Sequence, residues 1–255
     1  MTCKICNGPT SVLFKHLVLN RHTVRYDRCE ECGFVSTEEP HWLDEAYARP
    51  INLCDTGLLF RNEKMRDVFS LLFKIYFNKQ DRFLDYAGGY GVLTRFMRDC
   101  GFDFYWNDPF TENLFARGFE MTEEHIPYSA LTCCECFEHL ADPMQELQKQ
   151  LGISRNIFLT TTLISMNPPA PEDWDYYGFD HGQHVAFYTL KSLGIMARKH
   201  GLHLSSNGRQ FHYIGEKKIP RIMMQLAYSP LVRFTPYLVR ALNGSYTQAD
   251  HDRLS

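Results

Sequence analysis

Between residues 82 and 215 the sequence alternates short apolar runs with stretches of helical periodicity, and this alternation constrains the fold more than any other feature. Alternation of strands and helices is typical of a parallel sheet covered by helices on both faces. The sequence therefore predicts an α/β fold with a doubly wound sheet. The expected strands are 83–86, 102–106, 130–134 and 157–163, and the expected helices are 92–100, 111–117, 143–151 and 189–200.

Two further strands are expected at 202–206 and 211–214, after the last of these helices. Asn207-Gly208 separates them, and this dipeptide is a strong signal for a tight β-hairpin. We therefore expect the sheet to end in an antiparallel hairpin.

The segments outside this α/β region differ from it in composition. Residues 1–40 contain paired cysteines and strand-like alternation, which predicts a small β module. Residues 41–80 have helical periodicity, with Asn62 as the expected N-cap, and form a helical linker or lid next to the main domain at 81–215. Residues 216–255 form a C-terminal extension, in which 219–242 is apolar but interrupted by prolines and arginines. Packing on the body or on a second subunit is the simpler interpretation of this tail, and an interfacial role is the alternative.

A glycine-rich turn follows the first strand of the main domain, in the sequence Ala87-Gly88-Gly89-Tyr90-Gly91. Glycine is needed there if a nucleoside lies across the carboxyl end of the strand, and if the turn requires a positive φ. Asp108 ends the next strand, 17 residues after Gly91, where a carboxylate can accept both hydroxyls of a ribose. Both NAD and S-adenosylmethionine fit this arrangement.

Two residues favour S-adenosylmethionine over NAD. Thr94 stands where a dinucleotide fingerprint has its third glycine, so the sequence lacks the glycine that lets the helix approach a pyrophosphate closely. Asp85, at the end of the first strand, would attract the ammonium or sulfonium of a methionine moiety and would repel a pyrophosphate.

The segment from Phe83 to Pro109, followed by Glu135-Cys136-Phe137-Glu138-His139-Leu140-Ala141-Asp142-Pro143, resembles the pattern of class I methyltransferases over about residues 80–215. The resemblance implies a Rossmann-like sheet that ends in an antiparallel hairpin and binds S-adenosylmethionine. It also implies that the loop holds the methionine part of the cofactor, that Asp108 holds the ribose, and that Glu135 borders the active site. The loop residues are Asp85, Ala87, Gly88, Gly89 and Gly91.

Two positions in this pattern need comment. Ala87 stands where the family usually has its first glycine, and alanine is tolerated there if its φ is negative. Phe119 is a candidate to stack on the adenine, with packing in the core as the alternative.

Two Cys-x-x-Cys pairs lie near the N-terminus. Cys3 and Cys6 form the first pair, Cys29 and Cys32 the second, and 22 residues separate the pairs. This spacing predicts a four-thiolate zinc site, which is structural because four protein ligands leave no open position for chemistry. The remaining cysteines are expected to be small buried hydrophobes, namely Cys54, Cys100, Cys133, Cys134 and Cys136.

The segment 167–185 is rich in proline and aromatic residues and follows the expected strand 157–163, on the side of the sheet where ligands bind. Trp174, Tyr176 and Tyr177 are candidates to stack on a flat or sugar face, with packing of the loop as the alternative. His181 and His184 are the candidates for a general base, because an imidazole titrates near neutral pH.

Four segments are similar to bacterial methyltransferases of sugar and surface-polysaccharide biosynthesis: Cys3–Cys32, Pro40–Leu43, Asp55–Leu58 and His181–Thr189. The resemblance implies methyl transfer to a small molecule or glycan, to a sugar hydroxyl or a sugar carbon. Two alternatives stay open. One is an RNA methyltransferase whose zinc knuckle reads nucleic acid, and the other is a non-catalytic module that binds the cofactor.

Charge and hydropathy limit the partners and the location. The formal net charge is −3, so no global basic field favours a nucleic-acid backbone, and a small molecule is the better default partner. No charged segment followed by an apolar run opens the sequence and no run is long enough to span a bilayer, so a cytosolic location is expected. The sequence leaves the oligomeric state open, and a homo-oligomer is one option.

Overall fold

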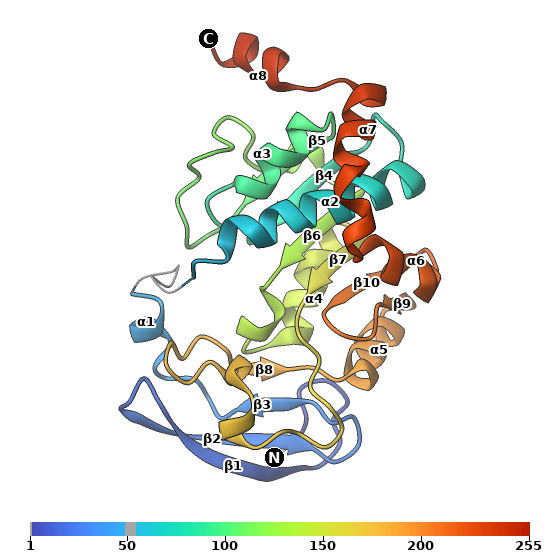
Figure 1. Cartoon of the computed structure of the whole chain (residues 1–255). Helices are drawn as coiled ribbons and strands as arrows, with labels where there is room; N and C mark the ends of the chain where they lie inside the picture. Colours follow the sequence, from blue (N-terminus) through green and yellow to red (C-terminus); the bar gives the residue numbers. More distant parts are fainter. Residues whose placement is uncertain (1, 49–54) are drawn as a thin grey trace. The chain divides into compact units, whose positions relative to one another are not determined.

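A computed structural model describes residues 2–48 and 55–255 and contains two β-sheets (Figure 1). The larger sheet has the strand order β5-β4-β6-β7-β10-β9. Its strands are β4 (Arg82–Tyr86), β5 (Asp103–Asn107), β6 (Ala130–Cys134), β7 (Asn156–Thr160), β9 (His203–Ser206) and β10 (Phe211–Gly215).

Strand direction in this sheet is mixed. β4 pairs in parallel with both β5 and β6, whereas β9 and β10 are antiparallel and are joined through Asn207-Gly208. The α/β fold and its terminal hairpin are thus confirmed.

Three of the expected helices are present as α3 (Val92–Asp99), α4 (Pro143–Ile153) and α5 (Leu190–Lys199). The helix expected at 111–117 is absent, so that prediction was wrong. Asp108 accepts the N–H of Thr111 and Asn113 accepts the N–H of Ala116, and such side-chain bonds compete with helical ones.

By its contacts the chain divides into two compact units. The first contains the described residues of 1–53 together with 135–149 and 159–218. Its own sheet has the order β1-β2-β3-β8, so a short strand from far along the chain completes the N-terminal β structure. The strands are β1 (Thr10–Val18), β2 (His22–Cys29), β3 (Val35–Thr37) and β8 (Ala186–Phe187).

Aromatic and branched side chains fill the core of this first unit. Trp42, just before the short helix α1 (Leu43–Ala46), is buried and donates from its indole nitrogen to the carbonyl of Gly182 (2.8 Å). The same core holds Val24 and Tyr26 of β2 and Phe187 of β8. Short 3₁₀ turns surround it at η2 (Phe137–His139), η3 (Pro171–Asp173) and η4 (Asp175–Tyr177).

The second unit contains the described residues of 54–134 with 150–158 and 219–255, and a cluster of phenylalanines forms its centre. The long helix α2 (Leu58–Tyr76) contributes Phe73, which stacks on Phe83 of β4 with 4.5 Å between ring centroids. The predicted helical periodicity is confirmed, because its expected apolar residues are all buried: Met65, Val68, Phe69, Leu72 and Phe73. The predicted start was wrong, since Gly57 is the N-cap and Asn62 lies inside the helix.

The C-terminal extension is helical and belongs to the second unit. Its elements are α6 (Arg221–Ala227), η5 (Pro230–Phe234), α7 (Thr235–Asn243) and α8 (Thr247–Leu254), and a further turn, η1 (Glu123–His125), lies earlier in the chain. α6, η5 and α7 contact α2, whereas α8 is held by the buried pair of Asp250 and Arg98. Among the described residues, no helix combines the length and hydropathy that crossing a bilayer requires.

Candidate functional site

The glycine-rich turn follows β4 and leads into α3. Gly89 and Gly91 have φ values of 54° and 84°, which explains the need for glycine at both. Ala87 has a φ of 57°, so the expectation of a negative φ there was wrong. An alanine in the left-handed region is strained by about 1–2 kcal/mol, and strain of this kind persists only where neighbouring structure imposes it.

Two side chains at the end of β5 fix this turn. Gly89 N–H donates to Oδ2 of Asp108 (2.9 Å), and Trp106 Nε1–H donates to the Gly89 carbonyl (2.8 Å). The other oxygen of Asp108 accepts the N–H groups of Phe110 and Thr111. A carboxylate offers about four acceptor positions, so Asp108 retains one for a ligand. Sequence reasoning missed Trp106, and no local signal marks an indole that bonds to a glycine carbonyl.

Asp85 lies beneath the turn and is only 2% exposed. Its carboxyl group accepts from Thr132 Oγ1 (2.7 Å) and Thr94 Oγ1 (3.4 Å). Burial raises its pKa to about 7, against the effect of the two hydroxyl donors. A Cβ on Gly88 would lie 2.8 Å from Oδ2 of Asp85, so the glycine at 88 is required by this close approach.

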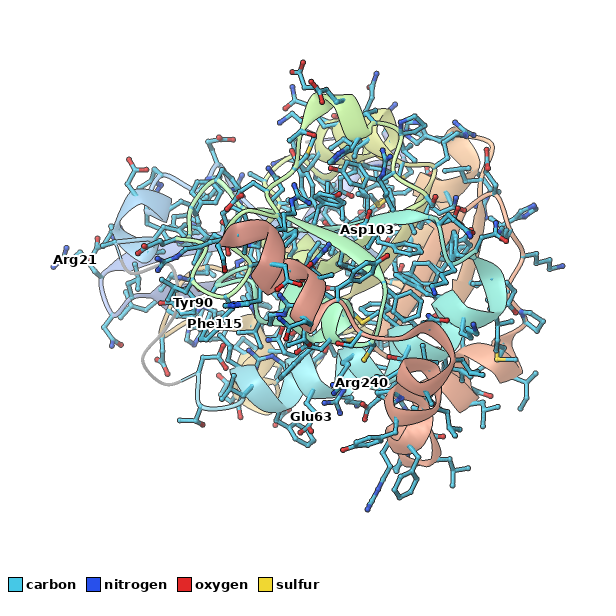
Figure 2. The ribbon with its side chains drawn as sticks, turned by 90° about the horizontal axis from the view of Figure 1, so that it is seen from above. Arg21, Glu63, Tyr90, Asp103, Phe115 and Arg240 are labelled. Carbon is cyan, nitrogen blue, oxygen red and sulfur yellow. The ribbon has the colours of Figure 1, made fainter. Side chains whose placement is uncertain are left out.

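The turn is open on one side at Gly89. A Cβ added to Gly89 meets no atom within 4 Å, in contrast to Gly88 and Gly91. The segment after Asp108 returns to the turn, because Phe115 N–H donates to the Tyr90 carbonyl (3.0 Å), and Figure 2 shows the two side chains next to each other. A glycine turn with open space above it and a carboxylate at its side suits a nucleoside with a short charged chain.

Phe119 lies in the core. It is 1% exposed, and the guanidinium of Arg98 lies 3.7 Å from the centre of its ring. Of the two alternatives for this residue, the structure favours core packing over stacking on an adenine.

Glu135 follows β6 directly and belongs to the first unit. It is exposed and has a φ of 50°, a strained conformation for a non-glycine residue. Thr160 holds it in a reciprocal pair, in which Glu135 N–H donates to Thr160 Oγ1 (2.8 Å) and Thr160 Oγ1 donates to Glu135 Oε1 (2.6 Å). Strain maintained in this way is common at functional sites.

The two candidate histidines differ in tautomer. Nδ1 of His184 lies 2.6 Å from the carbonyl oxygen of Tyr176, and because a carbonyl only accepts, Nδ1 carries the proton and Nε2 the lone pair. At His181 the N–H of Gln183 donates to Nδ1 (3.1 Å), so Nε2 carries the proton. Burial lowers the pKa of both rings, to about 4 for His181, and both are neutral at pH 7.

Further polar residues surround His184. Tyr176 OH donates to Oε1 of the buried Glu138 (2.7 Å), and His139 Nδ1 lies 2.8 Å from the Tyr47 hydroxyl. Burial, and next the neighbouring His184, lower the pKa of His139 well below its usual value. Glu138, His139 and His184 place ligand atoms within 4.8 Å of one another, a set that can also hold a divalent ion. Sequence reasoning missed Glu138 and His139 as site residues, although both stand in the quoted motif after β6.

The aromatic residues of segment 167–185 divide between core and surface. Tyr177 is fully buried, so packing is the interpretation that the structure favours for it. Trp174 and Tyr176 are partly buried against the same core.

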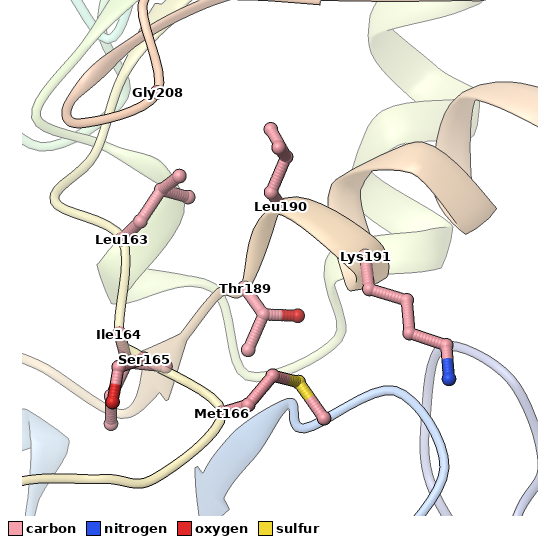
Figure 3. Close-up of a pocket in the computed structure, with 8 residues that line it drawn as sticks. All are labelled: Leu163, Ile164, Ser165, Met166, Thr189, Leu190, Lys191 and Gly208. Carbon is pink, nitrogen blue, oxygen red and sulfur yellow. The ribbon is translucent and has the colours of Figure 1, made fainter.

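The first unit also contains an open pocket of about 680 Å³ (Figure 3). Its lining includes Thr189, which caps α5, and Lys191, which donates to the Glu31 carbonyl. Neither a carboxylate nor a histidine is among its lining residues, and Lys191 is its one charged residue.

The four N-terminal cysteines converge. Cys3 Sγ lies 3.6 Å from Cys32 Sγ, and Cys6 Sγ lies 3.4 Å from Cys29 Sγ, so none of the four forms a disulfide. A tetrahedral zinc with 2.3 Å bonds needs sulfur atoms about 3.8 Å apart. Backbone N–H groups of Ile5, Gly8 and Cys32 point at three of the sulfurs, as they do in knuckles that stabilise thiolates.

The thiol pKa values favour a cation at this position. The hydrogen bond with Cys32 lowers the pKa of Cys3 to about 5, whereas the same bond raises that of Cys32 and burial raises that of Cys6. The Cys3–Cys32 pair thus shares one proton, and a cation bound among the sulfurs would favour further thiolates. Of the other cysteines, Cys100, Cys133 and Cys136 are buried and Cys134 is partly buried, as predicted, while Cys54 lies outside the described residues.

Several solved structures are similar to this chain at low sequence identity. CalO1, a methyltransferase in calicheamicin biosynthesis solved with SAH, matches with 10% identity over 59% of this chain and 54% of its own, at a TM-score of 0.40. Magnesium protoporphyrin IX methyltransferase from Synechocystis PCC 6803 matches with 12% identity over 69% and 95% of the two chains, at 0.49. The plantazolicin methyltransferase BpumL matches with 13% identity over 77% and 84%, at 0.47. This chain thus spans only about half of the length of CalO1.

No curated protein sequence matches the chain. The profile of a family described as a methyltransferase domain matches residues 58–207, which is more than half of the sequence. This match includes the glycine turn, Asp108 and the motif after β6. The chain belongs to the methyltransferase-domain family, as the sequence predicted.

Proposed function

We propose that this protein transfers the methyl group of S-adenosylmethionine to a hydroxyl of a small molecule or glycan, with a sugar as the acceptor. The observation that carries the proposal is the turn at Gly89, which has open space above it and Asp108 bonded at its side. When bound, S-adenosylmethionine supplies a methyl group on a positively charged sulfur. An acceptor oxygen takes this methyl group as the carbon–sulfur bond breaks, and the electron pair of that bond stays on sulfur.

Residues of the turn and of β5 suit different parts of the cofactor. The remaining acceptor position of Asp108 suits a ribose hydroxyl, and the glycines allow a ligand to approach the backbone closely. Asp85, beneath the turn, is available to ionise when a cationic ligand binds above it, because a nearby positive charge lowers a carboxyl pKa.

The acceptor hydroxyl must lose its proton as it is methylated, and we assign this proton to Nε2 of His184. The Tyr176 carbonyl fixes the tautomer that leaves Nε2 with a lone pair, and the lowered pKa keeps the ring neutral at pH 7. His181 has the opposite tautomer, in which Nε2 carries the proton, and this makes it the poorer candidate. Glu138 holds Tyr176 through the phenol and so supports the orientation of His184.

Calorimetric titration with S-adenosylhomocysteine tests the cofactor assignment. Gly89→Ala places a methyl group in the open space of the turn and is expected to weaken binding at least tenfold. Because the φ of Gly89 is 54°, the alanine is also expected to cost about 1–2 kcal/mol of stability. Gly201→Ala is the matched control, because Gly201 also has a positive φ, of 68°, and a Cβ there also meets nothing within 4 Å. Absence of binding by the unaltered protein would overturn the proposal.

Turnover with labelled S-adenosylmethionine and a panel of sugars and nucleotide sugars tests the acceptor and the base. His184→Ala is expected to lower kcat by 10² to 10⁴, about the contribution of a general base, whereas His181→Ala retains most activity. Loss in the opposite order would contradict the assignment. A normal level of activity in Asp108→Ala would favour a non-catalytic role for the turn.

The arginines of the N-terminal module support a small acceptor over RNA. Arg21 pairs with Glu45 (3.0 Å) and Arg25 with Asp27 (3.0 Å), so carboxylates compensate both charges. Arg28 donates to the Met166 carbonyl. Arg21 and Arg25 are therefore already paired with carboxylates, which leaves less positive charge for binding an RNA backbone.

We propose further that the four cysteine thiolates bind zinc and that the ion is structural. Metal analysis of the purified protein is expected to give one zinc ion, and Cys32→Ser to reduce both zinc content and the stability of the first unit. Zinc-free protein with an unchanged unfolding transition would contradict this. Reduced thiols at such a site also favour a cytosolic location.

A further inference from the structure

The C-terminal extension presents apolar side chains to solvent on a face of its own. We infer that this face, formed by α6, η5 and α7, binds the surface of an anionic membrane. Seven large apolar residues within 219–243 are exposed, six of them by 60% or more. They are Ile222, Leu226, Leu231, Phe234, Tyr237, Leu238 and Leu242, and we call them the apolar face.

The apolar face is not the side on which these elements pack. In α7, Pro236 and Val239 are buried, while Tyr237, Leu238 and Leu242 are 66–70% exposed. A helix that is apolar on both sides needs a second apolar surface to cover its outer side, because a side that faces water is normally polar. Exposed apolar patches of this extent mark interaction sites.

The charged residues in the segment that carries the apolar face are all positive. Between residues 217 and 249 the chain has five lysines and arginines and no aspartate or glutamate. Arg221, Arg233 and Arg240 of the extension are exposed. The acidic residues of α2, on which the extension packs, are Glu63 and Asp67, and both pair with Arg66. Figure 2 shows Arg240 and Glu63 on their separate helices.

This charge pattern selects the partner. In a symmetric dimer through the apolar face, arginines of one copy would face arginines of the other without a compensating carboxylate. An anionic bilayer instead attracts each cation and accepts the apolar side chains into its interface. Phe234 and Tyr237 suit the headgroup region, where aromatic side chains are enriched.

The geometry of the elements fits contact in the plane of the surface. α6 has 7 residues and α7 has 9, and the segment between them contains Pro230. Short helices of this kind lie on a bilayer with their apolar side chains in the boundary region.

Flotation of the full-length protein with vesicles tests the inference. Binding is expected to vesicles that contain phosphatidylglycerol, to be weak with phosphatidylcholine alone, and to fall as salt is raised. Replacing one arginine, as in Arg233→Gln, is expected to weaken binding about fivefold, from about 1 kcal/mol for each cation near the surface. Leu238→Glu is expected to abolish it.

The control is Val12→Glu, which changes a residue that is 58% exposed on β1 of the other unit and should leave binding unchanged. Circular dichroism and the unfolding transition check that each variant folds. Equal binding to neutral and anionic vesicles, or no binding to either, would overturn the inference. So would a dimer in sedimentation that Leu238→Glu converts to monomer, because the face would then serve self-association.

Discussion

The buried carboxyl group of Asp85 should make the stability of this protein fall as pH rises, and Asp85→Asn should remove that dependence. Asp85 is 2% exposed beneath the glycine turn, and burial raises its pKa from 3.8 to about 7. Asparagine has nearly the same shape and retains an oxygen that accepts from the Thr132 hydroxyl.

The magnitude follows from the difference between the two pKa values. A shift of about three units corresponds to about 4 kcal/mol, at about 1.4 kcal/mol for each unit. Because the native state holds the proton more tightly than the unfolded state, this stabilisation is complete below about pH 4. It is lost as pH rises from about 4 to 7, by about 1.4 kcal/mol for each pH unit, and the curve levels off above the native pKa.

Urea unfolding of the cofactor-free protein from about pH 4 to pH 8 measures the effect. The free energy of unfolding of Asp85→Asn minus that of the unaltered protein is expected to increase by about 3–4 kcal/mol over this range. Asp173→Asn is the control, because Asp173 is exposed and its substitution should leave the pH dependence unchanged. Parallel curves for Asp85→Asn and the unaltered protein would refute the reasoning.

Two further substitutions test the turn and the C-terminal anchor by urea unfolding at a single pH. Ala87→Gly is expected to stabilise the protein by up to about 1 kcal/mol. The left-handed φ of 57° costs alanine about 1–2 kcal/mol, and glycine loses about 0.5–1 kcal/mol more backbone entropy on folding. A destabilised variant would show that the alanine methyl group makes stabilising contacts. Asp250→Asn is expected to cost about 3 kcal/mol of stability, because it leaves buried Arg98 with Asp103 as its remaining carboxylate. Asp252→Asn is the control and should cost almost nothing, because Asp252 is exposed. Equal effects of the two substitutions would contradict the role of the Asp250–Arg98 pair.

The strands and most helices of the main domain were predictable, because apolar periodicity is a local property of the sequence. Ala130–Cys134 is a strand at the predicted residues, and Asn207-Gly208 closes the predicted hairpin. The helix predicted at 111–117 is absent because side chains bind its backbone. Its periodicity is helical, but the carboxylate of Asp108 and the amide of Asn113 take its backbone N–H groups, and propensity does not describe such bonds.

In the candidate site, sequence spacing located the groups but not their environments. Whether Ala87 has a positive φ, and whether Phe119 lies in the core or faces a ligand, depends on contacts with residues of other elements. The choice between His181 and His184 has the same origin. The backbone of Gln183 sets the tautomer of His181, and the backbone of Tyr176 sets that of His184. Residue type and position in the loop do not distinguish the two histidines.

The sequence by itself determined the α/β class, the glycine turn with its following carboxylate, and the two cysteine pairs, because periodicity, backbone freedom and ligand spacing act over a few neighbouring residues. Only the tertiary structure decided that β8 completes the N-terminal sheet and that Asp85 is buried with a raised pKa. These depend on burial and on partners far along the chain, such as Thr132, 47 residues from Asp85, and a local pattern does not encode them.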